Sequence, residues 1–140
     1  MQTITVGNAV ESLVCDFLKS HNLRFICSNY RCRLGEIDLV MFEEHSDTLV
    51  FIEVRYRASF HYGGATQSVD WKKQRKLRRA VLHYLQKNAT ARQRARIDVI
   101  GVSAPSEDIG NPFGPITHGV SMHEYRDHQL VWTRNAIEEC

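Results

Sequence analysis

Two carboxylates stand in runs of apolar residues that are typical of β-strands. Asp38 lies in one such run, and Glu53 follows Leu49 and Phe51 at the alternating spacing of one strand face. Arg55 projects from the same face as Glu53. A carboxylate in an apolar row is costly to desolvate unless a cation compensates it. An acid on one strand, with an acid and a base on the next, is the pattern that metal-assisted phosphodiester cleavage requires.

These residues also have purely structural interpretations. Glu11 lies at the margin of the apolar face of a predicted helix, where an acid is often exposed to water. Asp38 can be solvated, and Glu53 can form an ion pair with Arg55 near the end of its strand. The two strand acids are 15 residues apart across a predicted hairpin, which would bring them side by side. This combination favours a shared site.

Hydrophobic spacing predicts the elements that must position these side chains. Residues 6–20 have helical spacing, and a second helix is expected from about Ser68 or Val69 to Asn88, with Ser68 or Asp70 as its cap. Alternating and β-branched runs predict strands at 24–32, 36–42, 48–57 and 95–103. The order of these elements indicates one mixed α/β domain over residues 1–140, with an antiparallel meander in its central sheet.

The remaining segments are predicted with less regular structure. Residues 43–47 are typical of a polar turn, 58–67 and 105–115 of loops, and 116–140 of one strand and a short helix. Within the strand at 36–42, strict alternation places Ile37, Leu39 and Met41 on one face and the acids Glu36 and Asp38, with Val40, on the other.

Positive charge is concentrated in one part of the chain. The formal net charge is only +2, yet residues 71–97 hold ten basic residues and no acid: Lys72, Lys73, Arg75, Lys76, Arg78, Arg79, Lys87, Arg92, Arg94 and Arg96. A solvated helix face is one explanation. Contact with phosphates is another, because it offsets the like-charge crowding. Arg57 and the aromatic residues of the loop after it extend the expected nucleic-acid surface, whose contacts would be to phosphate and shape.

Composition excludes several classes of protein. Hydrophobic residues make up 43% and charged residues 24% of the 140, which is typical of a soluble globular domain. There is no apolar run long enough to cross a membrane, and we expect no secretory signal. The four cysteines lack a paired spacing, so we expect reduced thiols in a cytoplasmic protein, and the scattered histidines disfavour a zinc site.

The motif around the strand acids resembles a known family. Gly35-Glu36-Ile37-Asp38-Leu39, followed by Val50-Phe51-Ile52-Glu53-Val54-Arg55, is similar to the signature of the bacterial YraN-type proteins. These are endonuclease-like members of the PD-(D/E)XK nuclease superfamily and are similar to archaeal Holliday junction resolvases. The resemblance covers residues 5–102, which would form the core, with 103–140 as a loop and C-terminal extension. It implies a restriction-endonuclease-like fold, a mixed sheet flanked by helices.

The resemblance also implies roles for individual residues. Asp38 and Glu53 would be the main ligands of Mg²⁺ or Mn²⁺, with Glu11 as a third acid, acting directly or through water. Residue 55 would be the catalytic cation, but this chain has Arg55 where the family usually has lysine. Arginine is always protonated and cannot transfer a proton. Lys73 is therefore a second candidate for the catalytic cation.

Three functional hypotheses follow. The preferred one is a metal-dependent endonuclease that acts on branched or otherwise structured DNA, with DNA favoured over RNA. The second is a protein that binds nucleic acid on a nuclease scaffold without cleaving it, which Arg55 favours. The third is a protein-interaction module that uses residues 105–140. A membrane partner is not expected, and a homodimer is left open.

Overall fold

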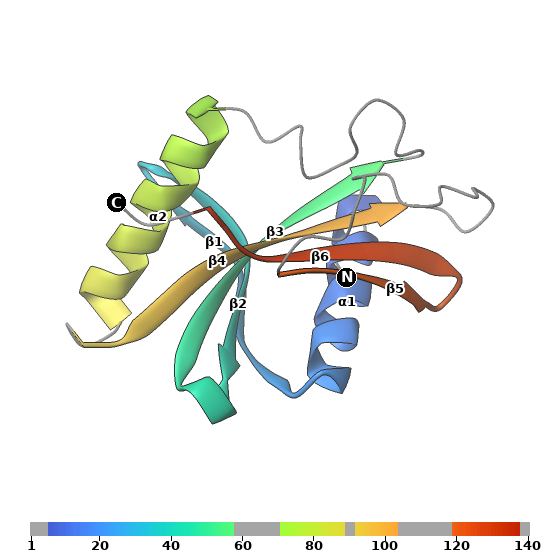
Figure 1. Ribbon diagram of the computed structural model, residues 1–140. Helices are drawn as coiled ribbons and strands as arrows, with labels where there is room; N and C mark the ends of the chain where they lie inside the picture. The colour runs from blue at the N-terminus through green and yellow to red at the C-terminus, as the bar shows by residue number, and fades with distance from the viewer. Residues whose placement is uncertain (1–5, 58–70, 89–91, 104–118, 138–140) are drawn as a thin grey trace, which may run out of the picture.

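A six-stranded mixed sheet forms the centre of the protein (Figure 1). The computed structural model describes residues 6–57, 71–88, 92–103 and 119–137. In order along the sheet, the strands are β1 (Leu23–Cys32), β2 (Gly35–Glu43), β3 (Thr48–Arg57), β4 (Arg94–Ser103), β6 (His128–Ile137) and β5 (Val120–Tyr125). The predicted loops at 58–67 and 105–115 and the predicted cap at Ser68 or Asp70 lie outside the described residues.

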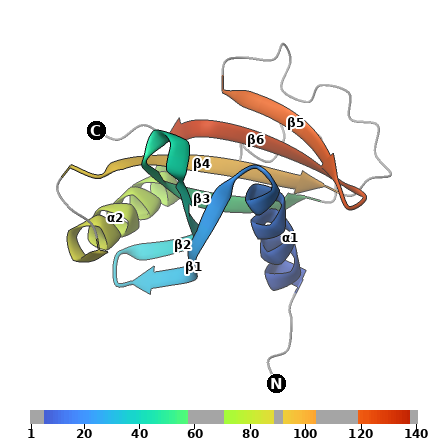
Figure 2. The ribbon, with the colours of Figure 1, turned by 90° about the horizontal axis from the view of Figure 1, so that it is seen from below.

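The predicted antiparallel meander is confirmed for β1, β2 and β3. Strand β4 then pairs with β3 in parallel, and this pairing needs the long crossover connection that contains helix α2 (Trp71–Asn88). The β1–β2 hairpin and the β5–β6 hairpin form the two edges of the sheet (Figure 2). The prediction of a mixed α/β fold is therefore right.

Strand β3 separates two hydrophobic cores because its side chains alternate between the two faces of the sheet. Val50 and Ile52 pack on the side of helix α1 (Val6–Ser20), with Val14, Phe17 and Leu18 among the buried helix residues. Leu49 and Phe51 pack on the side of α2, with Leu77, Ala80, Val81 and Tyr84. Each helix thus buries an apolar stripe on its own face of the sheet, and burial of each large side chain contributes about 1.5–3 kcal/mol.

One face assignment in β2 is wrong. Leu39 and Met41 pack on the α1 side as expected, but Ile37 packs in the α2-side core. The pairing of β2 with β3 extends only from Glu43–Thr48 to Leu39–Ile52. Beyond Leu39 the strand continues with β1 alone, so its twist is no longer held to the plane of the central sheet.

Gly35 allows α2 to lie against the start of β2. A Cβ atom at this position would come 2.6 Å from the backbone oxygen of Lys76 and 3.0 Å from its carbonyl carbon. Backbone cannot yield as a flexible side chain can, so any larger residue would push the helix away from the strand. This close approach fixes the basic end of α2 beside the strand acids.

The C-terminal segment differs from its prediction. Instead of one strand and a short helix, residues 120–137 form the β5–β6 hairpin, and β6 inserts between β4 and β5. Leu130, Val131 and Trp132 of β6 are fully buried, and Leu130 and Trp132 pack in the core on the α1 side of the sheet. This strand is therefore part of the same sheet as the core elements.

A buried ionic network ties β2, β4 and β6 together. Glu43 ends β2, although the sequence placed it in a polar turn, and both of its carboxylate oxygens accept bonds from Arg96, at 2.9 and 3.2 Å. Arg96 Nε also donates to the fully buried Asp98, which accepts from the indole of Trp132 at 2.9 Å and from the backbone N–H of Asn135 at 2.8 Å. Complete pairing of this kind is what makes buried charge tolerable.

No helix within the described part of the chain is long and apolar enough to cross a bilayer.

Candidate functional site

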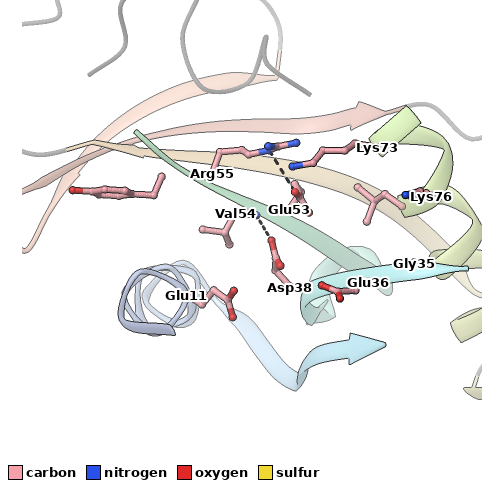
Figure 3. Close-up of a pocket in the computed structure, with 11 residues that line it drawn as sticks. Glu11, Gly35, Glu36, Asp38, Glu53, Val54, Arg55, Lys73 and Lys76 are labelled. Atoms are coloured by element: carbon pink, nitrogen blue, oxygen red, sulfur yellow. Dashed lines mark hydrogen bonds and ion pairs between the residues drawn. The ribbon is translucent and has the colours of Figure 1, made fainter. Parts of the chain in front are cut away.

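The site lies where β2 separates from β3. The β2–β3 ladder stops at Leu39–Ile52, and the next pair in the same register would be Asp38 and Glu53. Residues that oppose each other in an antiparallel pair project from the same face. This pair does not form, because Asp38 Oδ2 accepts a hydrogen bond from the backbone N–H of Val54 at 2.8 Å (Figure 3). A side-chain oxygen thus takes the role that a backbone carbonyl of β2 has in the ladder.

A pocket of about 640 Å³ opens at this point. It is lined by Glu11, Gly35, Glu36, Asp38, Glu53, Val54, Arg55, Tyr56, Lys73, Lys76 and Leu77. All five residues predicted to form a catalytic site are on this list, and they come from α1, β2, β3 and α2. Figure 3 shows the acids and the bases of these four elements converging on one space.

The two strand acids perturb each other in this pocket. Burial raises the pKa of Asp38, against the opposing effect of the hydrogen bond from the Val54 amide. Burial, with the negative charge of Asp38 as the second cause, raises the pKa of Glu53 to about 7. Two carboxylates that share a desolvated site cannot both ionise at low cost unless a cation is added. The arrangement therefore favours the uptake of a proton or a metal ion.

Arg55 contacts Glu53 as its position on the same strand face predicted. Its Nε lies 3.4 Å from Glu53 Oε1, and the two side chains are only 12% and 18% exposed. The ion pair that the structural interpretation expected is therefore present. The same arrangement also places Arg55 in the pocket, as the functional interpretation expected. Lys73 of α2 also lies near Glu53 and acts to lower its pKa (Figure 3).

Glu11 approaches the pocket from α1. It is half-buried, and its pKa is raised mainly by burial and next by the charge of Asp38. Among the residues that the structure describes, no three His, Cys, Asp or Glu side chains form a group that could hold a metal ion. The residues thus provide two carboxylates at one place and a third nearby. The role of Glu11 as a third acid, directly or through water, stays a prediction.

The basic residues of α2 divide into two groups. Lys73 and Lys76 line the pocket, while Lys72, Arg75 and Arg79 are exposed beyond it and Arg78 is half-buried. Arg57 ends β3, and its side chain lies outside the described residues. A surface of exposed cations therefore continues from the acid pair along the first turns of α2.

Sequence reasoning missed two features of the site, both of them backbone features. The Val54 amide fixes the carboxylate of Asp38, and Gly35 lets α2 approach. The glycine directly before the acidic motif was a usable signal, because a glycine in a strand often marks the close approach of another backbone. The Val54 amide had no such signal, since it depends on where the ladder ends.

The fold and the site define a class of protein. A mixed sheet with an antiparallel meander, a helix on each face and paired strand acids at the point where β2 leaves β3 is a restriction-endonuclease-like α/β fold. The uncharacterised protein family UPF0102 matches over residues 10–102, and this chain belongs to that family, which is the YraN-type family that the motifs resemble.

Individual relatives support this assignment. The chain is 42% identical over 132 residues to a UPF0102 protein of Methylococcus capsulatus, covering 94% of this chain and 89% of the relative. It is 42% identical over 133 residues to one of Stutzerimonas stutzeri, covering 94% and 93%. It is also 44% identical over 99 residues to one of Nitrosococcus oceani, covering 70% and 78%. In the first two relatives the similarity extends beyond residues 10–102.

Proposed function

We propose that this protein is an endonuclease that hydrolyses phosphodiester bonds of DNA with a divalent cation held by Asp38 and Glu53. The observation that carries the proposal is a pair of half-buried carboxylates that face two basic side chains in one pocket. Such a pair is unfavourable by itself, because burial and mutual repulsion disfavour its ionised form. A divalent cation would remove that cost.

The donor set fits Mg²⁺ or Mn²⁺. Both prefer carboxylate oxygens, and Mg²⁺ usually takes one or two protein carboxylates and keeps several waters. When bound, the cation would act as a Lewis acid on the phosphoryl oxygen and activate water for attack. Glu11, at the rim of the same pocket, would act on the hydration shell through hydrogen bonds.

Arg55 and Lys73 would stabilise the charge that develops on the phosphoryl group. Arg55 is held beside Glu53 by β3, and Lys73 enters from α2, so their positions are set before substrate arrives. The exposed cations Lys72, Arg75 and Arg79 would bind the backbone on either side of the scissile bond. Contacts of this kind carry no sequence information, so the substrate would be recognised by charge and shape, as branched or structured DNA requires.

The test is cleavage of linear, nicked, flapped and four-way DNA with Mg²⁺ or Mn²⁺ under single-turnover conditions. We expect Glu53→Ala to abolish cleavage. Glu36→Gln is the matched control, because Glu36 lines the same pocket but is exposed and paired with Arg31. Equal cleavage by wild type and Glu53→Ala would show a contaminating nuclease and would remove the proposal. Cleavage of only the junction or flap substrates would support the structured-DNA part.

A second candidate is nucleic-acid binding without cleavage. It is favoured by Arg55, since a guanidinium cannot transfer a proton and differs from lysine in shape. Cleavage assays of wild type, Arg55→Lys and Lys73→Ala separate the two candidates. If Arg55 is a poorer catalytic cation, Arg55→Lys should raise cleavage; if Lys73 has taken the role, Lys73→Ala should lower it at least tenfold while Arg55→Lys changes little. No cleavage by any of these proteins, with intact DNA affinity, would establish the binding protein.

A further inference from the structure

Arg55 is an unusual residue for a site that has to bind a metal ion. Its side chain is only 12% exposed, so its charge is largely removed from water. Within the described residues, Nε and Nη2 are buried and make no hydrogen bond, and the contact of Nε with Glu53 at 3.4 Å is an ion pair without hydrogen-bond geometry. A buried guanidinium with unused donors is costly, because each lost bond to water is left without replacement.

Arg55 lines the pocket that would receive a phosphate. Figure 3 shows its guanidinium beside the side chain of Lys73, with Glu53 below both. The planar fork of arginine matches the oxygens of a phosphate group, which is the acceptor best suited to two adjacent N–H donors. A phosphodiester in this pocket would bring such an acceptor close to the guanidinium of Arg55.

The same guanidinium also competes with a metal ion. Glu53 Oε1 is one of the oxygens that a cation would need, and Arg55 forms an ion pair with it. A fixed positive charge at that distance repels a divalent cation and weakens its attraction to the carboxylate. A phosphate bound to Arg55 would cancel much of this repulsion. The positive charge that opposes the metal in the free protein is thus the one that the substrate neutralises.

We propose that Arg55 couples the two ligands of this site, so that it holds the affinity of the free protein for a divalent cation low and a bound phosphodiester raises it. This inference rests on the proposed metal and phosphate sites, but it concerns binding rather than cleavage. Because coupling is reciprocal, the metal must raise the affinity for DNA by the same factor. The protein would therefore assemble its complete site more readily on nucleic acid than in its absence.

The first test needs no DNA. Binding of Mn²⁺ to the free protein is measured by titration calorimetry for wild type, Arg55→Gln and Arg55→Lys. Arg55→Gln should bind Mn²⁺ about fivefold more tightly or better, as for a typical coupling between sites, whereas Arg55→Lys keeps the charge and should stay near wild type. Arg55→Met, which keeps the apolar stem of the side chain, is the second neutral variant if Arg55→Gln does not fold.

Lys76→Gln is the matched control, since it removes one positive charge from the same pocket with no contact to Glu53 recorded in the structure. An equal gain in Lys76→Gln would reduce the effect to general electrostatics and overturn the proposal. Unchanged or weaker Mn²⁺ binding in Arg55→Gln would overturn it as well. If neither wild type nor the neutral variants bind Mn²⁺, the metal site of the proposed function is also wrong. Failure of the proposed function is thereby distinguished from failure of the coupling alone.

The second test measures the coupling itself. The anisotropy of a short fluorescein-labelled DNA duplex gives its affinity with and without Mn²⁺, and a denaturing gel afterwards confirms that the duplex is intact. We expect Mn²⁺ to tighten DNA binding by wild type about tenfold, and this factor to fall severalfold in Arg55→Gln. The same factor in both proteins would show that metal and phosphate attract each other directly without Arg55, and would contradict the proposal.

Discussion

Val54 donates its backbone N–H to Asp38 Oδ2 at 2.8 Å, at the position where the β2–β3 ladder has ended. The register would pair Val54 with Ile37, but β2 has already turned away to pack on the α2 side. A carboxylate thus satisfies a strand amide and is held at a defined place between two strands. The hydrogen bond from the Val54 amide fixes the orientation of the Asp38 carboxylate without neutralising its charge.

This relationship separates the structural role of Asp38 from its proposed role as a ligand. Asp38→Asn keeps an acceptor for the Val54 amide and removes a charge that burial disfavours. We therefore expect its free energy of unfolding to match or exceed that of wild type, while binding of Mn²⁺ is lost. Asp38→Ala leaves the amide without its partner and should cost about 1–3 kcal/mol. Chemical denaturation and calorimetry measure both effects; equal destabilisation by the two variants would contradict the prediction.

The raised pKa of Glu53 predicts how stability depends on pH. The folded protein holds the proton of Glu53 up to about pH 7, whereas the unfolded chain releases it near 4.5. The native state therefore binds more protons than the unfolded state between these values, and stability contributed by Glu53 is present below 4.5 and lost as the pH rises through about 7.

Glu53→Gln should remove this loss. We expect the variant to be more stable than wild type by about 1–3 kcal/mol near pH 8 and similar near pH 4, measured by urea denaturation across that range. Glu36→Gln, which changes an exposed acid of the same pocket, is the control and should not reproduce the gain in stability near pH 8. A stabilisation that does not depend on pH would contradict the assignment.

Glu43 predicts the opposite dependence. Its hydrogen bonds with Arg96 lower its pKa from 4.5 to about 2, so its contribution to stability is present above 4.5 and lost as the pH falls through about 2. Glu43→Gln should cost about 2–4 kcal/mol at neutral pH, and the difference from wild type should shrink on acidification below 4.5. Glu44→Gln is the control, because its ion pair with Arg24 is exposed and should be worth little.

The exposed cations of α2 predict salt-dependent binding. If Lys72, Arg75 and Arg79 contact phosphates, a plot of log affinity for DNA against log salt should have a slope of magnitude roughly 0.9 for each contact. Reversal of the three to glutamate should weaken binding about equally for different DNA sequences and reduce that slope. Lys87→Glu, at the far end of the same helix, is the matched control. No loss of affinity in the triple variant would exclude this surface from DNA binding.

Much of the fold could be predicted because its signals are local. The bounds of α1, Val6–Ser20, and of β3, Thr48–Arg57, agree with those expected from apolar periodicity. Strand β4 begins one residue earlier than expected, and α2 ends at the expected residue, Asn88. Side-chain period is set within each segment by backbone geometry, so it can be recognised without knowledge of the partners.

The C-terminal hairpin and the buried network could not be predicted in the same way. Whether residues 128–137 form a strand depends on β4, which supplies their hydrogen bonds from a distant part of the chain. Asp98 shows the same dependence, since its charge is compensated by Arg96, Trp132 and Asn135 from two strands. Non-local pairing leaves no periodic mark on either segment, and the sequence of 116–140 suggested one strand and a short helix instead.

For the candidate site, the strand patterns were enough to predict which acids could meet. Asp38 and Glu53 lie one step beyond the last pair of the β2–β3 ladder, because a short hairpin connection leaves few registers for the two strands. The environment of these acids depends on the folded chain. Packing sets how deeply they are buried, the Val54 amide donates a hydrogen bond to Asp38, and Arg55 forms an ion pair with Glu53. Those properties arise because α2 packs directly on Gly35 and β2 leaves the ladder beneath it, and desolvation depends on every element that covers a group rather than on its neighbours in the chain.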